Sequence, residues 1–184
     1  MPMNWQWKGL RMHIVLLSAV LGFLLLWGGR LSYWRLGYEK PLTKVLEQRQ
    51  DIVRYALQQQ RNQLVVEVLP RRLYDLPRFY NSLQRDIQKT VGEKPFRLML
   101  QDRRDAVLQE LWPAARLAMG EAVQRGNYVE MADLIQRQAA ARGARAVLFI
   151  DDQRLYLQMY HQDAYLYDIV PRLNQVKQGA APPG

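Results

Sequence analysis

The sequence predicts an α+β protein with one N-terminal transmembrane helix, followed by a small mixed-sheet domain of order β-α-β-α-α-β-β-β. Three observations predict this class. Residues 12–29 contain no Asp, Glu, Lys or Arg and are almost all apolar. From residue 64 onward, short β-branched runs alternate with runs whose apolar residues recur at helical spacing. Three further strand-like runs then follow one another, which is typical of an antiparallel meander.

The apolar run 12–29 is the predicted membrane anchor. Its 18 residues would span about 27 Å as a helix, close to the hydrocarbon thickness of a bilayer. Aromatic and basic side chains flank it on both sides, as they do at membrane interfaces: Trp5, Trp7, Arg11, Trp27, Arg30 and Trp34. A cleaved signal peptide is the alternative, with residues 1–11 as its basic flank. A signal peptidase needs small residues after the run, and none of the required pattern is present, so we expect an uncleaved signal anchor.

Two arguments about the orientation of the anchor oppose each other. Arg30, Arg35, Lys40 and Lys44 follow the run, and counting charges alone favours a cytoplasmic domain. A short basic N-terminus before an apolar run is, however, the usual arrangement of an anchor whose N-terminus stays inside. We therefore expect a single-pass protein of the cell membrane with its folded domain outside the cytoplasm.

Residues 30–63 are predicted to form a juxtamembrane amphipathic helix. Apolar residues recur at helical spacing among glutamines and charges: Leu42, Val45, Leu46, Ile52, Val53, Ala56 and Leu57. Such a helix would pack on its own domain or act as a stalk. Alternatively, it would pair two copies of the chain in a short coiled coil, although scarcely two heptads are available.

The folded domain is predicted to occupy residues 64–173. Residues 64–69 are β-branched and form the first strand, which Pro70 ends. Asp75 and Pro77 begin a helix that stops at Gly92, and residues 95–100 form the second strand.

The helical stretch that follows carries apolar residues from Val107 to Val123, and Pro113 is expected to kink it or split it. Asn127 with Glu130 predicts a capping box for a further helix, which ends at Gly143.

The runs 146–150, 155–160 and 165–170 are predicted to pair as antiparallel neighbours, because short polar turns join them. One mixed sheet with the helices on one face would bury the apolar stripes. Residues 174–184 have nothing to bury and are expected to be disordered.

The composition excludes several kinds of chemistry. The chain has no cysteine, which excludes disulfides, thiolate nucleophiles and Cys-ligated metals. It has two histidines, one of them in the anchor, so a triad or a multi-histidine centre cannot be built. Asp151 and Asp152 together with His161 and Asp163 have ligand-like spacing, but turn chemistry is the simpler explanation. Nothing beside the acidic pair 102 and 105 indicates perturbed ionisation. We therefore expect no catalytic residue, no metal and no cofactor.

Two groups of side chains are the candidate binding residues. Arg78, Arg85 and Lys89 share one helix face, and Arg71 would extend the row. The chain carries a net charge of +9, so anionic lipid, a wall polymer or an acidic partner would fit this row, and nucleic acid only if the domain is cytoplasmic. The second group consists of tyrosines on the last strands, which would form either an exposed platform or half-buried packing: Tyr156, Tyr160, Tyr165 and Tyr167.

The sequence thus favours a membrane-anchored, non-catalytic binding or scaffold protein of a bacterial envelope complex, with a protein partner in the envelope. The alternative is a sensor or carrier domain that binds an anionic ligand, a wall polymer or a lipid headgroup through the basic helix face. An enzyme would need a carboxylate pair in a cleft.

Overall fold

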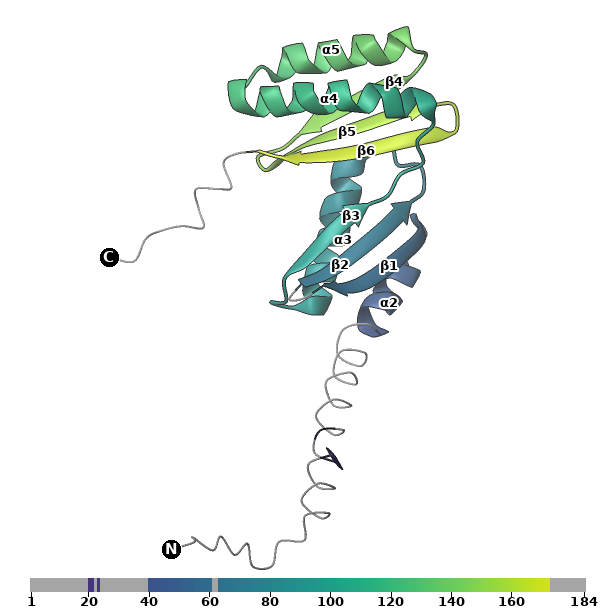
Figure 1. The fold of residues 1–184 in the computed structure, drawn as a ribbon, viewed down its shortest axis with the longest axis vertical. Coiled ribbons are helices and arrows are strands. Elements are labelled where there is room, and N and C mark those ends of the chain that lie inside the picture. Colours follow the sequence, from purple (N-terminus) through teal and green to yellow (C-terminus); the bar gives the residue numbers. More distant parts are fainter. Residues whose placement is uncertain (1–19, 22, 24–39, 61–62, 173–184) are drawn as a thin grey trace, which may run out of the picture.

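The structure is a computed structural model that describes residues 20, 21, 23, 40–60 and 63–172. Ten elements follow one another in this part of the chain from residue 40 onward: α2 (Lys40–Glu47), β1 (Ile52–Gln60), β2 (Gln63–Pro70), α3 (Leu76–Val91), β3 (Phe96–Leu100), α4 (Ala106–Arg125), α5 (Tyr128–Ala141), β4 (Arg145–Ile150), β5 (Arg154–His161) and β6 (Ala164–Pro171). The class is mixed α and β, as predicted, and the predicted order is found with one additional strand and one short helix at its start (Figure 1).

The first sheet has the order β1-β2-β3. β1 pairs antiparallel with β2, and Gln60 faces Gln63 at their hairpin. β2 pairs parallel with β3, and Leu64 faces Phe96. Alternate residues of β2, such as Val66 and Val68, are buried against α2 and α3. The sheet is therefore covered by helices on one face, and β1 and β3 are its edges (Figure 1).

The predicted juxtamembrane helix of residues 30–63 is wrong over its second half. Helix α2 ends at Glu47, and residues 52–60 form strand β1. Arg49 lies at the break and donates hydrogen bonds to the Asp51 and Asp86 carboxylates, which ties the end of α2 to α3. Beyond that point Tyr55 and Leu57 alternate toward the core with exposed residues between them, because the segment pairs with β2. In the sequence, the spacing of the apolar residues after Arg49 fits a helix as well as a strand, and the strand was therefore not predicted.

Helix α3 confirms the predicted boundaries. The Asp75 carboxylate accepts a hydrogen bond from the Arg78 amide at 2.9 Å, and Pro77 lies in the first turn. Gly92, with φ of 64°, ends the helix. Its buried face is apolar throughout and consists of Leu76, Phe79, Leu83, Ile87 and Val91.

Helix α4 is continuous through Pro113, so the expected split does not occur. Pro113 is exposed, as is Gln109 one turn before it, and water can bond the carbonyl that loses its partner. The next helix, α5, begins after Asn127 as expected. The predicted capping box is wrong, because the Asn127 side chain accepts no backbone hydrogen bond and instead lies 3.4 Å from the Glu130 carboxylate.

The second sheet has the order β4-β5-β6 and is the predicted antiparallel meander. Residues on one face pack against α4 and α5, among them Leu155, Leu157 and Leu166. The opposite face carries the four tyrosines and packs against α3 and the segment before it. The predicted single mixed sheet is therefore wrong: the described residues form two three-stranded sheets, and the tyrosine face of the second sheet packs on α3, which also covers the first sheet (Figure 1).

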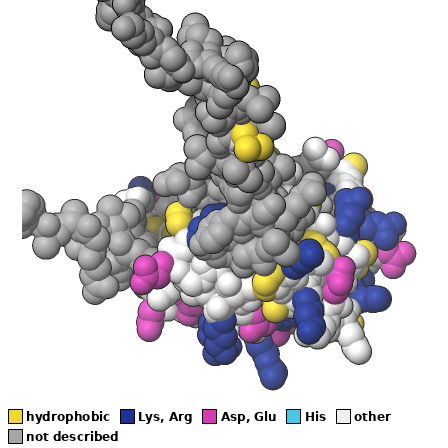
Figure 2. Space-filling model, turned by 90° about the horizontal axis from the view of Figure 1, so that it is seen from below, with side chains coloured by type: hydrophobic (Ala, Val, Ile, Leu, Met, Phe, Trp, Pro, Cys, Tyr) yellow, Lys and Arg dark blue, Asp and Glu magenta, His cyan; other side chains and the backbone are white. Residues whose placement is uncertain are grey.

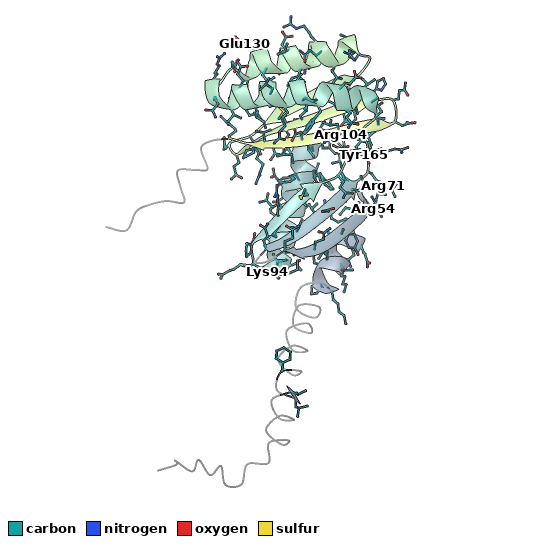
Figure 3. All side chains as sticks on the ribbon, viewed as in Figure 1. Arg54, Arg71, Lys94, Arg104, Glu130 and Tyr165 are labelled. Atoms are coloured by element: carbon teal, nitrogen blue, oxygen red, sulfur yellow. The ribbon has the colours of Figure 1, made fainter. Side chains whose placement is uncertain are left out.

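The segment between β3 and α4 joins the two sheets. Arg103 exchanges two backbone hydrogen bonds with Tyr165 of β6, at 3.0 and 2.8 Å. The Asp102 carboxylate accepts from the Tyr167 amide at 3.2 Å. Figure 3 shows Arg104 and Tyr165 at this junction. The outer edge of β6 is thus contacted at Tyr165 and Tyr167, whereas the outer edge of β3 pairs with no strand among the described residues.

Several predictions lie outside the described residues: the basic flank 1–11, most of the anchor 12–29, its interface residues, and the tail 174–184. Within the described part of the chain, no helix has both the length and the apolar character needed to cross a membrane. The three described residues of the predicted anchor are helical and exposed: Val20, Leu21 and Phe23.

Candidate functional site

The four tyrosines of β5 and β6 are buried: Tyr156 0%, Tyr160 9%, Tyr165 7% and Tyr167 4% exposed. Their hydroxyls bond the main chain or a neighbouring carboxylate. Tyr165 donates to the Pro70 carbonyl at 2.8 Å, Tyr160 donates to the Leu73 carbonyl, and Tyr167 accepts from the Leu73 amide at 2.6 Å. Burial raises the pKa of all four hydroxyls, so they stay neutral at physiological pH. The two predicted alternatives for these tyrosines were an exposed platform and packing within the sheet. The structure shows the packing.

Gln158 is a buried amide that the sequence analysis did not single out. Its Oε1 accepts from the Leu76 amide at 3.1 Å, and its Nε2 donates to the Leu73 carbonyl at 3.1 Å and to the Tyr160 hydroxyl. Gln158 therefore binds the first turn of α3 to the centre of the second sheet. One signal was available: it is a polar residue in a strand whose neighbours on both sides are apolar.

The carboxylates that could take part in acid–base chemistry are engaged in structural contacts. Asp168, 8% exposed, accepts from Trp112 Nε1 at 2.7 Å and from the Arg116 guanidinium. Asp102 forms an ion pair with Arg104 at 2.8 Å. The Asp168 contacts fix α4 on the second sheet, because Trp112 and Arg116 lie on α4.

His161, the last residue of β5, contacts Asp105, the residue before α4. Its Nδ1 lies 2.5 Å from the Asp105 Oδ2, and the same carboxylate accepts from the Leu108 amide at the start of α4. The hydrogen bond from His161, followed by that from Leu108, lowers the pKa of Asp105. The Asp105 carboxylate therefore bonds both His161 at the end of β5 and the first turn of α4, which holds α4 against the β5–β6 turn.

The ligand-like spacing of acidic residues does not assemble a metal site in the described residues. No cluster of three or more His, Asp or Glu side chains able to hold a metal occurs there. Asp151 instead accepts from the amides of Gln153 and Arg154, both at 2.8 Å, and from the Tyr156 hydroxyl at 2.7 Å. This is the turn chemistry that the sequence favoured.

The basic row on α3 lies on the surface, as predicted. Arg78, Arg85 and Lys89 are all exposed, and their spacing places them on one face. Arg71 does not extend the row, because its guanidinium donates to the Gln50 carbonyl at 2.9 Å, at the turn between α2 and β1. Figure 3 places Arg71 beside Arg54, on the first sheet.

A polar groove runs along α3 beside this row. One part, of about 650 Å³, lies between α3 and the β4–β5 turn and is lined by Asn81, Gln84, Arg85, Gln88, Asp151, Asp152, Gln153 and Arg154. A second part, of about 500 Å³, shares Gln84 and Gln88 and reaches the β3 strand. Arg154 is fixed in its wall by bonds to Asn81 and Gln84. The lining offers amides, guanidinium groups and carboxylates to a polar ligand.

Comparison of the chain with protein-family models, with curated proteins and with solved structures gave no match. The function therefore has to be inferred from the chain's own side chains and surfaces.

Proposed function

We propose that the chain is a membrane-anchored, non-catalytic binding or scaffold protein of a bacterial envelope complex, with its folded domain outside the cytoplasm. The observation that carries the proposal is how the reactive side chains are used. Three of the four buried tyrosine hydroxyls and Gln158 bond the backbone of residues 70–76, and His161, Asp105 and Asp168 fix α4. Groups committed to the fold in this way are poorly placed for acid–base work, so the surfaces are left to act.

The uncovered face of the first sheet supports a role in protein binding. Arg54, Arg97 and Met99 are exposed on this face, and no described helix covers it (Figure 1). Val53 is 58% exposed and Met99 41% exposed. A mixed apolar and charged face, whose edge strands have no further partner among the described residues, is the kind of surface on which protein partners assemble.

The anchor and the orientation of the domain can be tested with single cysteines, since the chain has none. Leu117 is 75% exposed on α4, and a Leu117→Cys variant should react with a membrane-impermeant maleimide in intact spheroplasts. The protein should also stay with the membranes after alkaline carbonate extraction. Labelling only after lysis would contradict the extracytoplasmic domain, and recovery in the extract would contradict the anchor.

The scaffold role requires a second experiment. A photo-crosslinking amino acid at Met99 should yield the same discrete crosslinked products in repeated experiments, whereas the same group at Leu117 should not. The absence of discrete products at Met99, with normal membrane insertion, would count against a partner on this face.

The groove beside Arg85 favours a second candidate, a sensor or carrier domain for an anionic ligand or wall polymer. Binding through guanidinium groups should weaken as salt increases, and it should weaken further in an Arg78→Ala, Arg85→Ala double variant. A scaffold that acts through the first sheet should tolerate both changes.

A further inference from the structure

The end of the domain at which α2 begins is rich in lysine. Four of the six lysines of the chain lie in the described residues, at Lys40, Lys44, Lys89 and Lys94. Lys40 and Lys44 are on α2, Lys89 is in the last turn of α3, and Lys94 is in the turn before β3. We call these four residues the lysine end.

Contacts and figures place these elements on one end of the molecule. The Lys94 ammonium donates to Gln59 near the β1–β2 hairpin at 2.8 Å, and the Leu64 amide donates to the Pro95 carbonyl at 3.0 Å. Figure 3 shows Lys94 at the lower tip of the first sheet, and Figure 1 shows α2 at the same level. Figure 2, seen from this side, shows Lys and Arg side chains spread over the visible surface, with acidic side chains among them.

Three of the four residues of the lysine end carry charges that the fold does not pair. Lys40, Lys44 and Lys89 are exposed and form no ion pair with any described residue. Arginines such as Arg49 and Arg116 are paired with carboxylates of the fold, whereas exposed arginines such as Arg85 form no ion pair with a described residue. A group of exposed ammonium charges that the fold does not use is available for an external anion.

We propose that the lysine end docks on anionic lipid headgroups, so that the domain rests on the membrane instead of standing away from it; this inference rests on the proposed anchor. The geometry points to a lipid surface because the predicted anchor ends at residue 29 and α2 begins at Lys40. The intervening ten residues span about 35 Å at most, and about 15 Å as a helix. The lysine end is therefore the part of the domain that the tether keeps closest to the headgroups.

The electrostatics agree with this placement. The attraction of lysine to anionic headgroups decays over a screening length of about 8 Å at physiological salt, so it acts only if the domain approaches the surface. The anchor keeps the effective concentration of headgroups high, so that modest individual attractions suffice. Lysine suits this task, because its compact ammonium group can meet headgroup charges that have no fixed arrangement. The planar guanidinium group of arginine is better suited to carboxylates that the fold holds in place.

The test uses the full chain in vesicles that contain a nitroxide-headgroup lipid as quencher. A fluorophore on Gln60→Cys reports the lysine end, and one on Val129→Cys, 84% exposed on α5, reports the opposite end. With phosphatidylglycerol at about one third of the lipid, the Gln60 probe should be quenched more strongly than in phosphatidylcholine alone, and the excess should vanish at about 1 M salt. The Val129 probe should be equally bright in both vesicles.

Matched variants separate docking from folding. Changing Lys40, Lys44 and Lys89 to Gln should abolish the excess quenching without changing the circular dichroism spectrum. The control variant changes three exposed arginines on α4, on α5 and just after α5 to Gln: Arg125, Arg137 and Arg142. It removes the same amount of charge and should leave the excess quenching of the Gln60 probe intact. Equal quenching in both lipids, with the chain co-floating, would overturn docking alone. Failure to co-float with either vesicle would overturn the anchor, and docking with it.

Discussion

Tyr165 of β6 donates its hydroxyl to the carbonyl of Pro70, the last residue of β2, at 2.8 Å. The two residues are 95 positions apart in the chain and belong to different sheets. Tyr160 and Tyr167 bond Leu73 three residues further on. The loop that leads from the first sheet into α3 is therefore held by side chains of the second sheet, so the two sheets should unfold together.

Replacing Tyr165 by Phe should destabilise the domain, because the buried Pro70 carbonyl would lose the hydrogen bond that the Tyr165 hydroxyl donates. The expected loss is about 1–2 kcal/mol of unfolding free energy. Urea denaturation of the detergent-solubilised chain, followed by far-UV circular dichroism, measures it. The matched control is Tyr74→Phe, since Tyr74 is 87% exposed and should change little. Equal stability of the two variants would show that the Tyr165 bond adds nothing.

The positions of the tyrosines could be predicted from the sequence, but their role could not. Alternation along β5 and β6 predicted that Tyr156, Tyr160, Tyr165 and Tyr167 lie on strands. Whether that face of the sheet is exposed to solvent or buried depends on the segment that packs against it. That segment is the loop after β2, and no local pattern in the sequence indicates a partner that distant.

The missed strand β1 has a comparable cause. Leu42 and Leu46 gave a true helical spacing, and the apolar residues after Arg49 continued it by coincidence. What makes residues 52–60 a strand is the neighbouring β2 edge, a tertiary contact that overrides local spacing. Helix α3, by contrast, carried its own start and stop signals at Asp75 and Gly92 and was predicted to within a residue.

Replacing Gln158 by Leu should cost more than the loss of one bond. The change leaves the Leu76 amide and the Leu73 carbonyl buried with fewer partners, and about 2–4 kcal/mol of unfolding free energy should be lost. Gln136, exposed on α5, provides the control, and Gln136→Leu should stay within about 0.5 kcal/mol of the parent. If urea midpoints show Gln158→Leu as stable as the control, the amide is not the link between α3 and the second sheet.

The pair of His161 and Asp105 predicts a pH dependence of stability. The folded-state pKa of Asp105 is lowered, chiefly by the His161 hydrogen bond, and therefore lies below the unfolded value of about 3.9. The ionised carboxylate stabilises the fold above that unfolded value, and the stabilisation is lost as pH falls through the folded pKa. An Asp105→Asn variant should be less stable than the parent at pH 7, and the difference should shrink as pH falls below about 4.

Carboxyl chemical shifts can follow the same pair directly. In a His161→Asn variant the pKa of Asp105 should rise toward its ordinary value, while the Leu108 amide bond keeps part of the lowering. An unchanged Asp105 titration after loss of His161 would contradict the assignment of the shift.

Arg49 should control how firmly α2 is held to the domain. Its guanidinium donates hydrogen bonds to Asp51, Asp86 and Ser82 at 2.8 to 3.1 Å. The hydrogen bond to Asp51 raises the pKa of Arg49, so the guanidinium stays charged. An Arg49→Lys change keeps the charge but cannot make all these bonds, and should lose about 1 kcal/mol of stability. Amide hydrogen exchange should accelerate in α2 more than in α4.

The control for this change is Arg54→Lys on the uncovered face of the first sheet, where the guanidinium is exposed. It should leave α2 protection as it is in the parent. Because Lys40 and Lys44 lie on α2, loosening this helix should also weaken the lipid-dependent quenching of the Gln60 probe, even though every lysine is retained. Normal quenching with a loosened α2 would assign docking to Lys89 and Lys94, which α3 and its turn hold in place independently of Arg49.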